Sequence, residues 1–353
     1  MTVDNGLSIE EIRTTLARVN RTWEHVIEQT RPVSRRLRIA EVNVDVVVSG
    51  DALADILLPP FDGLDEARGA SQSTVGAWDV AATGFAFPDR PAVRAPGRYR
   101  CMVRRAGRPV AELEWASPDV FRTGDRVARR HLLAVRAASA LSPREGASPL
   151  RRQLNWALGP DVLFVHAGAV GDADGVALLM GASGTGKSST SVACLRAGMG
   201  FLSDDYCLVR GDPPVVHRLY ATARLFDHDV QQFADFLEPA VGASLVDPES
   251  DSDMKALYLL HPSQPDRILA SAHARVVIIP EPRGERRPRL EPIGPAEVLR
   301  RVAPSALWQM NLEPDRELAG LRDLVSALPC FRLVLSRDRD ANPALIQEAL
   351  GAV

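Results

Sequence analysis

The chain has 353 residues, a hydrophobic fraction of 46% and a formal net charge of −3 at pH 7. These values are typical of a globular protein with one large domain or two ordinary ones. The charge leaves no basic surplus for nucleic acid or an anionic membrane surface, and no apolar run approaches the ~20 residues of a membrane-spanning helix, so neither partner is expected.

The N-terminus and the cysteines indicate a cellular compartment. The N-terminal residues contain no basic segment followed by an apolar one, so no secretory signal is expected. The cysteines lie far apart and form no Cys-x-x-Cys pair, which favours reduced thiols in the core. They are Cys101, Cys194, Cys207 and Cys330. The sequence therefore predicts a cytoplasmic protein.

The first part of the chain predicts a helix followed by strands. Residues 8–29 begin with a capping-box pattern and continue with apolar residues at helical spacing, which predicts a helix. Residues 37–48 are rich in β-branched side chains and predict a strand, and residues 99–105 and 109–115 predict a hairpin. Residues 31–120 are therefore expected to form a small β-rich unit.

A connecting segment follows. Residues 129–140 carry leucines and valine among good helix formers and predict a helix. Residues 142–149, Ser-Pro-Arg-Glu-Gly-Ala-Ser-Pro, resemble a linker. We therefore expect two domains: residues 1–150, a leading helix and a β-rich domain suited to substrate recognition, and residues 151–353, a second domain of α/β class.

Strand and helix patterns alternate in the second domain. The expected strands are residues 162–170, 175–180, 206–210, 215–220, 274–280 and 331–335. The expected helices are residues 151–158, 189–195, 295–303, 315–327 and 342–351.

One glycine-rich stretch stands between a predicted strand and a predicted helix. Residues 181–188 read Gly-Ala-Ser-Gly-Thr-Gly-Lys-Ser, which matches the phosphate-binding P-loop pattern. Gly181 and Gly186 permit a close backbone approach, so that N–H groups and the positive end of the helix face phosphate oxygens. Lys187 would reach the β- and γ-phosphates of ATP, and Ser188 would bind Mg²⁺.

The expected nucleotide-binding residues extend slightly beyond this loop. They are Gly181, Ala182, Ser183, Gly184, Thr185, Gly186, Lys187, Ser188, Ser189 and, more distant in sequence, Arg224. For Arg224, an ordinary salt bridge is the alternative interpretation.

Lysine is rare in this chain. Lys187 and Lys255 are the two lysines among 42 basic residues, and the others are arginine. Because lysine presents a compact ammonium, Lys255 is a candidate for stabilising the phosphoryl group during transfer. A solvated surface lysine is the alternative.

Two adjacent carboxylates, Asp204 and Asp205, follow the apolar residues Phe201 and Leu202 at a predicted strand end. Adjacent side chains in extended backbone point to opposite faces, so one carboxylate would hold Mg²⁺ while the other faces a substrate hydroxyl. We assign Asp204 to the metal, together with Ser188, and Asp205 to the role of base. The reverse assignment, a turn that brings both to the metal, and a plain surface turn stay open.

The order of these features resembles a known family. An apolar strand with His166, the glycine-rich loop, a helix that ends in glycine and Phe-Leu-Ser-Asp-Asp at residues 201–205 resemble the catalytic core of the HPr kinase/phosphorylase family. Other segments resemble the HPr-kinase-like serine kinases of bacteria, some of which tailor ribosomally made peptides. They are residues 219–225, 255–256, 303–309 and 329–333.

The resemblance implies a fold and residue roles. The family shares its P-loop architecture with phosphoenolpyruvate carboxykinase, which implies a mixed sheet. It also implies that Asp204 and Asp205 form the acidic pair of metal ligand and base, and that His166 lies beside the phosphates. A hydrogen-bonded core histidine is the alternative for His166. Ser189 departs from the glutamate of the bifunctional enzymes and their C-terminal signature is not found, so the sequence leaves open whether the reverse phosphorolysis occurs.

We therefore expect an ATP- and Mg²⁺-dependent kinase that phosphorylates a serine of a peptide or small protein. Two alternatives remain: a nucleotide-binding regulatory module whose N-terminal unit binds a partner, and a kinase for a small-molecule hydroxyl. The sequence leaves the oligomeric state open, and a homo-oligomer is compatible with it.

Overall fold

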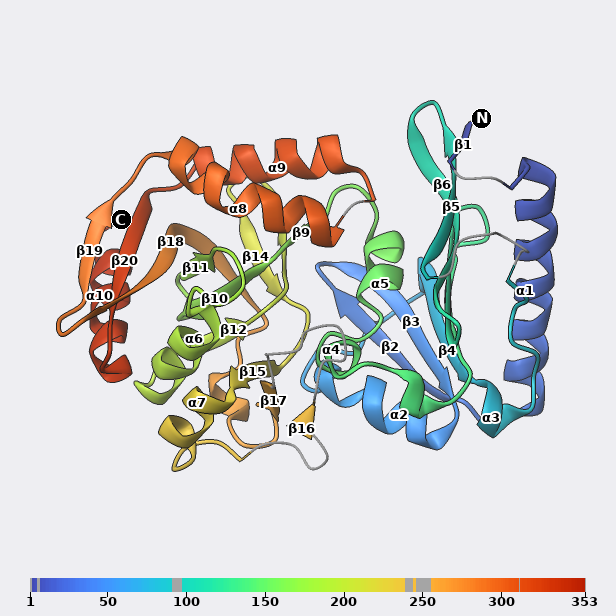
Figure 1. Cartoon of the computed structure of the whole chain (residues 1–353), viewed down its shortest axis with the longest axis horizontal. Coiled ribbons are helices and arrows are strands. Elements are labelled where there is room, and N and C mark those ends of the chain that lie inside the picture. Colours follow the sequence, from blue (N-terminus) through green and yellow to red (C-terminus); the bar gives the residue numbers. More distant parts are fainter. Residues whose placement is uncertain are drawn as a thin grey trace. The chain divides into compact units, whose positions relative to one another are not determined.

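The structure is a computed structural model that describes residues 2–4, 7–90, 97–238, 244–245, 255–310 and 312–352. The chain divides into two compact units (Figure 1). The first comprises Met1–Pro59 and Asp65–Gly159, and the second comprises Pro60–Leu64 and Pro160–Val353.

The first unit is built on a mixed eight-stranded sheet in the order β1-β5-β6-β7-β8-β4-β3-β2. Its strands are β1 (Thr2–Asp4), β2 (Val33–Ile39), β3 (Val42–Ser49), β4 (Ser73–Asp79), β5 (Tyr99–Arg105), β6 (Arg108–Ser117), β7 (Val120–Asp125) and β8 (Arg130–Val135). Strands β3, β4 and β8 are parallel, and the other neighbours are antiparallel. The hairpin expected around residues 106 and 107 is confirmed as β5 and β6.

Helices cover this sheet. They are α1 (Ile9–Gln29), α2 (Asp51–Leu57), α3 (Val80–Thr83), α4 (Pro143–Ala147) and α5 (Arg151–Leu158). The predicted helix over residues 8–29 is confirmed as α1, which begins with a reciprocal capping box between Ser8 and Glu11. Its apolar face packs on one face of the sheet, where Trp23 contacts Trp78.

Three predictions in this half are wrong in part. The single strand over residues 37–48 is two strands, β2 and β3, because Ala40 and Glu41 adopt positive φ angles and reverse the chain. The helix over residues 129–140 is instead β8, whose buried side chains lie between β4 and β7. Here tertiary pairing overrides helix propensity. The expected linker contains the short capped helix α4.

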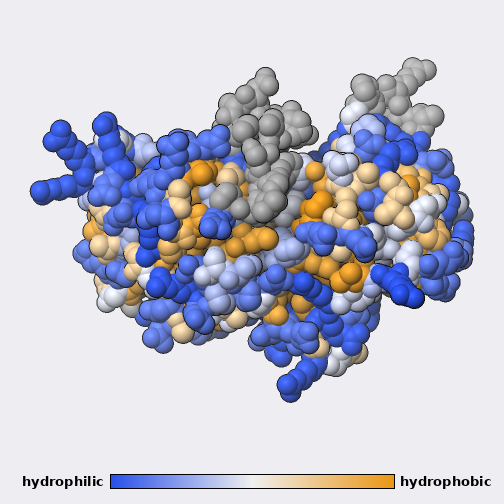
Figure 2. Space-filling model, turned by 90° about the horizontal axis from the view of Figure 1, so that it is seen from below, coloured by the Kyte–Doolittle hydropathy of each residue, from blue (hydrophilic) through white to orange (hydrophobic). Residues whose placement is uncertain are grey.

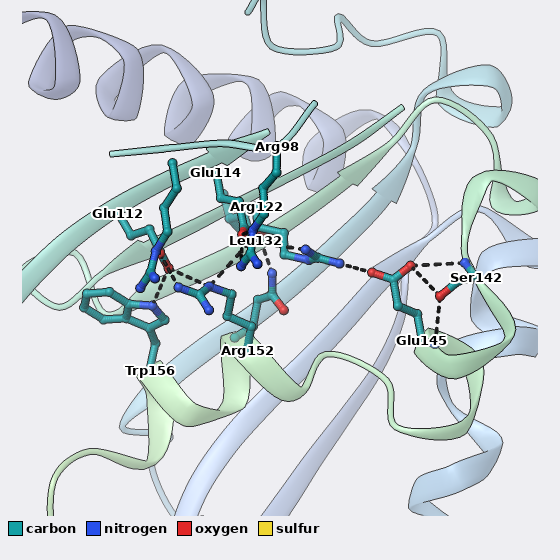
Figure 3. A network of polar contacts seen from close by, with 11 residues as sticks. Arg98, Glu112, Glu114, Arg122, Leu132, Ser142, Glu145, Arg152 and Trp156 are labelled. Atoms are coloured by element: carbon teal, nitrogen blue, oxygen red, sulfur yellow. Dashed lines mark hydrogen bonds and ion pairs between the residues drawn. The ribbon is translucent and has the colours of Figure 1, made fainter. Parts of the chain in front are cut away.

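Two buried glutamates of β6 hold α5 against the first sheet (Figure 3). Arg152 of α5 donates to Glu112 at 2.9 Å, and Trp156 Nε1 donates to the same carboxylate at 2.9 Å. Gly124 of β7 leaves the space that the Trp156 ring fills. Since these contacts tie α5 to the first sheet, the division between the units falls after Gly159 rather than after residue 150.

The second glutamate, Glu114, is surrounded by guanidinium groups (Figure 3). Burial raises the pKa of this carboxyl, but the charges of Arg122, Arg152 and Arg98 outweigh burial and lower it to about 2. The carboxylate therefore stays ionised, and its charge is paired with guanidinium groups.

The second unit contains a larger mixed sheet in the order β12-β10-β11-β18-β14-β13-β9, with β20 beside β18 and β19 beside β20. The strands are β9 (Leu163–Val165), β10 (Ala167–Gly171), β11 (Val176–Met180), β12 (Gly200–Ser203), β13 (Cys207–Arg210), β14 (Val215–Arg218), β18 (Ser271–Glu285), β19 (Arg289–Pro292) and β20 (Cys330–Ser336). A smaller sheet is formed by β15 (Thr222–Phe226), β16 (Ser244–Leu245) and β17 (Lys255–Leu259).

Helices cover both faces of the larger sheet. They are α6 (Lys187–Arg196), α8 (Pro295–Met310), α9 (Pro314–Ser326) and α10 (Asn342–Gly351), whereas α7 (Asp227–Val230) contacts β15 and β17 of the smaller sheet. Alternate residues of β11 belong to two cores: Leu179 packs with α6 and α10, and Leu178 packs with α8 and α9. This explains why β11 is wholly apolar. The predicted α/β class with a mixed sheet is therefore confirmed.

One face of the molecule is mainly hydrophilic (Figure 2). Figure 2 shows mainly hydrophilic side chains on one face, with smaller hydrophobic areas between them. Within the described ranges, no helix combines the length and the apolar character that crossing a bilayer requires.

Candidate phosphate-binding and acidic site

The Gly181–Ser188 loop connects β11 to α6. Gly181, Gly184 and Gly186 have φ angles of 146°, 79° and 91°, which other residues rarely adopt. A Cβ atom at Gly186 would also lie 2.7 Å from Leu335 Cδ1. Gly186 is the N-cap of α6 and provides no side-chain cap, so the first amides of this helix are available to an anion.

The Lys187 ammonium is hydrogen-bonded to the backbone of its own loop. Its Nζ donates to Gly181 O at 2.8 Å and to Ala182 O at 2.9 Å, and the residue is only 6% exposed. Burial lowers the pKa of Lys187, whereas the charges of Asp205 and Asp204 raise it. Both carboxylates therefore lie close enough to act on the cation.

Sheet topology explains why Asp204 is near the loop. Strand β10 is antiparallel to both β11 and β12, so β11 and β12 are parallel and end at the same edge. Asp204 follows β12 directly, as Gly181 follows β11. Polar groups that come after parallel strands are expected to meet at this edge.

Asp204 is almost inaccessible, with 3% exposure. Its Oδ2 accepts a hydrogen bond from Arg224 N at 2.9 Å, whereas its Oδ1 has no hydrogen-bond partner among the residues that the structure describes. Burial and the charge of Asp205 raise the pKa of Asp204 to about 6, against the opposing hydrogen bonds of Arg224 N and the Ser188 hydroxyl. A buried carboxylate oxygen without a donor is a candidate for a cation ligand.

Asp205 has different surroundings. Its Oδ1 lies 2.8 Å from His166 Nε2, and the side chains of Asp205 and His166 are 26% and 6% exposed. Tyr206 stacks on the imidazole with 5.4 Å between ring centroids. Asp205 is therefore oriented by one neighbour and still reachable from solvent.

His166 lies at a break between strands. The single strand predicted over residues 162–170 is two strands, because β9 pairs with β13 whereas β10 pairs with β11 and β12. His166 lies between them, at the point where the chain changes neighbours. The break directs its side chain toward Asp205 rather than into a regular strand position.

Lys255 begins β17 and is paired with Phe226 of β15. Its Nζ lies 4.1 Å from the centroid of the Phe226 ring, a cation–π contact. The charge of Lys255 lowers the pKa of both Lys187 and Asp204, which places it near the loop. The two lysines of the chain therefore share one electrostatic environment.

Some predicted residues occupy supporting positions. Arg224 contacts Asp204 through its backbone N–H and not through its guanidinium. Ser189 Oγ donates to Gly186 O at 3.4 Å, and Thr185 Oγ1 donates to Ala182 O at 3.0 Å. These hydroxyls hold the loop backbone.

The residues present fit a magnesium ion. Within the described ranges, no group of three or more His, Cys, Asp or Glu side chains converges on one point, so a metal cage made only of protein ligands is absent. Magnesium is commonly held by one or two protein oxygens together with substrate phosphates and water. The Ser188 hydroxyl and the unpartnered Oδ1 of Asp204 supply that kind of ligand set.

Arg339 is a residue near the loop that the sequence analysis missed. Its Nη1 lies 3.9 Å from the position that a Cβ atom would take at Gly186. More than 150 residues of sequence separate the two, so only the sheet order, with β20 parallel to β18 and β18 parallel to β11, brings them together.

The chain matches no protein-family model and no curated protein. Among solved structures, it is similar to the HPr(Ser) kinase/phosphatase from Coxiella burnetii, with a TM-score of 0.28 and 12% sequence identity over 54% of this chain and 88% of that chain.

Proposed function

We propose that the protein is an ATP- and Mg²⁺-dependent kinase that transfers the γ-phosphoryl group to a hydroxyl. The observation that carries this proposal is the contrast between two adjacent carboxylates beside one glycine-rich loop. Asp204 is buried next to Ser188, whereas Asp205 is partly exposed and held by His166. Phosphoryl transfer needs both a carboxylate for the metal and a carboxylate for the attacking hydroxyl.

The loop and α6 bind the phosphates in this proposal. The amides at the start of α6 have no side-chain cap, and Lys187 provides a positive charge within the loop. Ser188 and Asp204 hold Mg²⁺, which supplies charge neutralisation at the phosphates when bound. The ammonium of Lys187, now bonded to Gly181 O and Ala182 O, is available to exchange these neutral acceptors for charged phosphate oxygens.

Asp205 acts on the acceptor. It removes the proton of the attacking hydroxyl as the bond between that oxygen and the γ-phosphorus forms and the bond to the β-phosphate oxygen breaks, so that ADP leaves. His166 Nε2 lies 2.8 Å from Asp205 Oδ1 and fixes the direction of the carboxylate. Lys255 stabilises negative charge that develops on the transferred group.

The acceptor class rests on the sequence resemblance. It favours a serine of a peptide or small protein, and the partial exposure of Asp205 is compatible with a substrate of that size. A small-molecule hydroxyl would use the same residues, since the chemistry at Asp205 does not depend on what carries the hydroxyl.

Incubating the full chain with γ-labelled ATP, Mg²⁺ and pools of serine-containing peptides tests the proposal. Phosphoserine on a peptide supports it, and label on a small-molecule alcohol instead would keep the reaction and change the acceptor. Bound ATP that is not consumed with any pool would favour a regulatory nucleotide-binding module. Omitting Mg²⁺ serves as the internal control, because transfer should then stop while the chain stays folded.

A further inference from the structure

Arg339 lies on the far side of the glycine-rich loop from the acidic pair. In the sheet order β12-β10-β11-β18-β20, Asp204 follows the strand at one end and Arg339 follows the strand at the other. The strands β12, β11, β18 and β20 are mutually parallel and end at the same edge. The loop after β11 therefore has the acidic pair on one flank and Arg339 on the other.

The turn that carries Arg339 is held in place by hydrogen bonds. Ser336 Oγ accepts from Asp338 N at 3.1 Å, and Ser336 N donates to Asn342 Oδ1 at 2.9 Å. Arg339 itself begins the 3₁₀ turn Arg339–Ala341, which contacts α6. These hydrogen bonds fix the backbone on both sides of Arg339.

The guanidinium is also oriented by a buried partner. Arg339 Nη2 donates to Asp229 Oδ1 at 3.2 Å, and the side chains of Arg339 and Asp229 are 17% and 6% exposed. His228 Nε2 lies 3.6 Å from Asp229 Oδ2. One edge of the guanidinium is thus occupied, while Nη1 is the atom that lies toward Gly186.

The charges at this place favour an anion. A cation beside a helix N-terminus is unfavourable, because the N-terminus already carries about half a positive charge. Here α6 begins at Lys187 without a side-chain cap, and Arg339 lies next to its N-cap, Gly186. On this flank Asp229 is the carboxylate that pairs with Arg339, whereas on the other flank Asp204 Oδ1 has no hydrogen-bond partner among the residues that the structure describes.

We propose that Arg339 is a nucleotide-binding residue that contacts the phosphate chain through Nη1, on the flank of the loop opposite Asp204. This inference rests on the proposed function for its ligand, and it assigns a residue that the loop pattern does not contain. Asp229 holds the guanidinium in place before the nucleotide arrives, so less side-chain freedom is lost on binding.

Calorimetric titration of the full chain with Mg²⁺ and ATP, and separately with inorganic tripolyphosphate, tests the proposal. Replacing Arg339→Gln should weaken the binding of both ligands by about 10- to 100-fold, because one charge-assisted hydrogen bond is lost. Arg337→Gln is the matched control: Arg337 lies two residues away in the same turn and is exposed, so its loss should leave both affinities nearly unchanged.

The outcomes separate the possibilities. Weaker binding of ATP with unchanged binding of tripolyphosphate would overturn the phosphate contact and indicate a contact with the nucleoside. A lower melting temperature with unchanged affinities would show that Arg339 and Asp229 form only a structural tie. If the wild-type chain binds ATP and transfer fails, the proposed function falls while this inference stands; if it binds neither ligand, both fall.

A second variant keeps the test valid if Arg339→Gln does not fold. Arg339→Lys keeps the charge but loses the planar fork of the guanidinium, so it should weaken tripolyphosphate binding by a smaller factor, about threefold. Wild-type affinity in this variant together with wild-type affinity in the Gln variant would exclude a role for Arg339 in binding.

Discussion

His166 Nε2 lies 2.8 Å from Asp205 Oδ1, whereas the adjacent Asp204 has its Oδ2 bonded to the backbone of Arg224. Two carboxylates that are neighbours in sequence therefore have separate surroundings. One is oriented by an imidazole at the surface of the site, and the other is buried beside the loop. This separation is the structural basis for giving them different roles.

The first prediction concerns His166. Replacing His166→Gln should lower the rate of phosphoryl transfer by about 10-fold and leave the affinity for ATP unchanged, because only the orientation of Asp205 is disturbed. Steady-state rates and nucleotide titration measure the two effects. Tyr206→Phe keeps the ring that stacks on His166 and should behave like the wild type. Equal losses in both variants would contradict this prediction, because Tyr206→Phe keeps both the stacked ring and the contact between His166 and Asp205.

The second prediction concerns stability and pH at Asp204. Burial raises the pKa of Asp204 from 3.8 to about 6, so the folded chain binds this proton more tightly than the unfolded chain does. The favourable contribution of this proton is complete below about pH 4 and is lost as the pH rises through about 6. Without metal, Asp204→Asn should therefore be more stable than the wild type above about pH 6, by roughly 1–3 kcal/mol, and equally stable below about pH 4.

Thermal unfolding at several pH values with a chelator present measures this difference. Adding Mg²⁺ with ADP should stabilise the wild type more than the Asn variant, since the variant lacks the carboxylate ligand. A variant that is less stable than the wild type at every pH would mean that Asp204 serves a structural role.

The third prediction concerns Lys255. Replacing Lys255→Ala should reduce the transfer rate by about 10- to 100-fold with a smaller effect on ATP affinity, because the ammonium acts on charge that develops during transfer. Phe226→Leu removes the ring under Lys255 Nζ but keeps the charge, so it should lower the rate less. Activity at the wild-type level in Lys255→Ala would identify Lys255 as a surface residue without a catalytic role.

The fourth prediction concerns the first unit. A Cβ atom at Gly124 would lie 2.4 Å from the Trp156 ring, so Gly124→Ala should displace α5 and destabilise this unit by about 1–3 kcal/mol. Denaturant unfolding followed by tryptophan fluorescence measures the change. Gly107→Ala provides a contrast: its Cβ meets no atom, so only backbone strain at its φ angle of 77° contributes. A wild-type unfolding midpoint in Gly124→Ala would contradict the packing described.

The elements with strong local signals could be predicted from the sequence. The capping box of α1 and the Ala106-Gly107 turn between β5 and β6 are local patterns, and all three elements were predicted. The helix predicted over residues 129–140 failed because the pairing of β8 with β4 and β7 is not local. Leucines and valine at these positions satisfy a central strand as well as a helix.

The site could be predicted in part. The glycine-rich loop and the adjacent aspartates are motifs, so their positions in sequence were enough to propose them. The contact between Asp205 and His166 depends on the break between β9 and β10. Residues 162–170 form one apolar run in the sequence, which gave no sign of this break. Arg339 could not be found, because its proximity to Gly186 arises from the order of parallel strands and from no local pattern.

The proposed reaction depends on Asp205, which removes the proton from the acceptor hydroxyl. The most direct measurement compares wild type and Asp205→Asn for transfer of label from γ-labelled ATP to an accepted serine peptide, with nucleotide affinity measured on the same samples. We predict that transfer falls by about 100- to 10,000-fold while ATP affinity stays within about threefold. Transfer at the wild-type rate in Asp205→Asn, or a loss of ATP affinity large enough to explain the lower rate, would contradict the account.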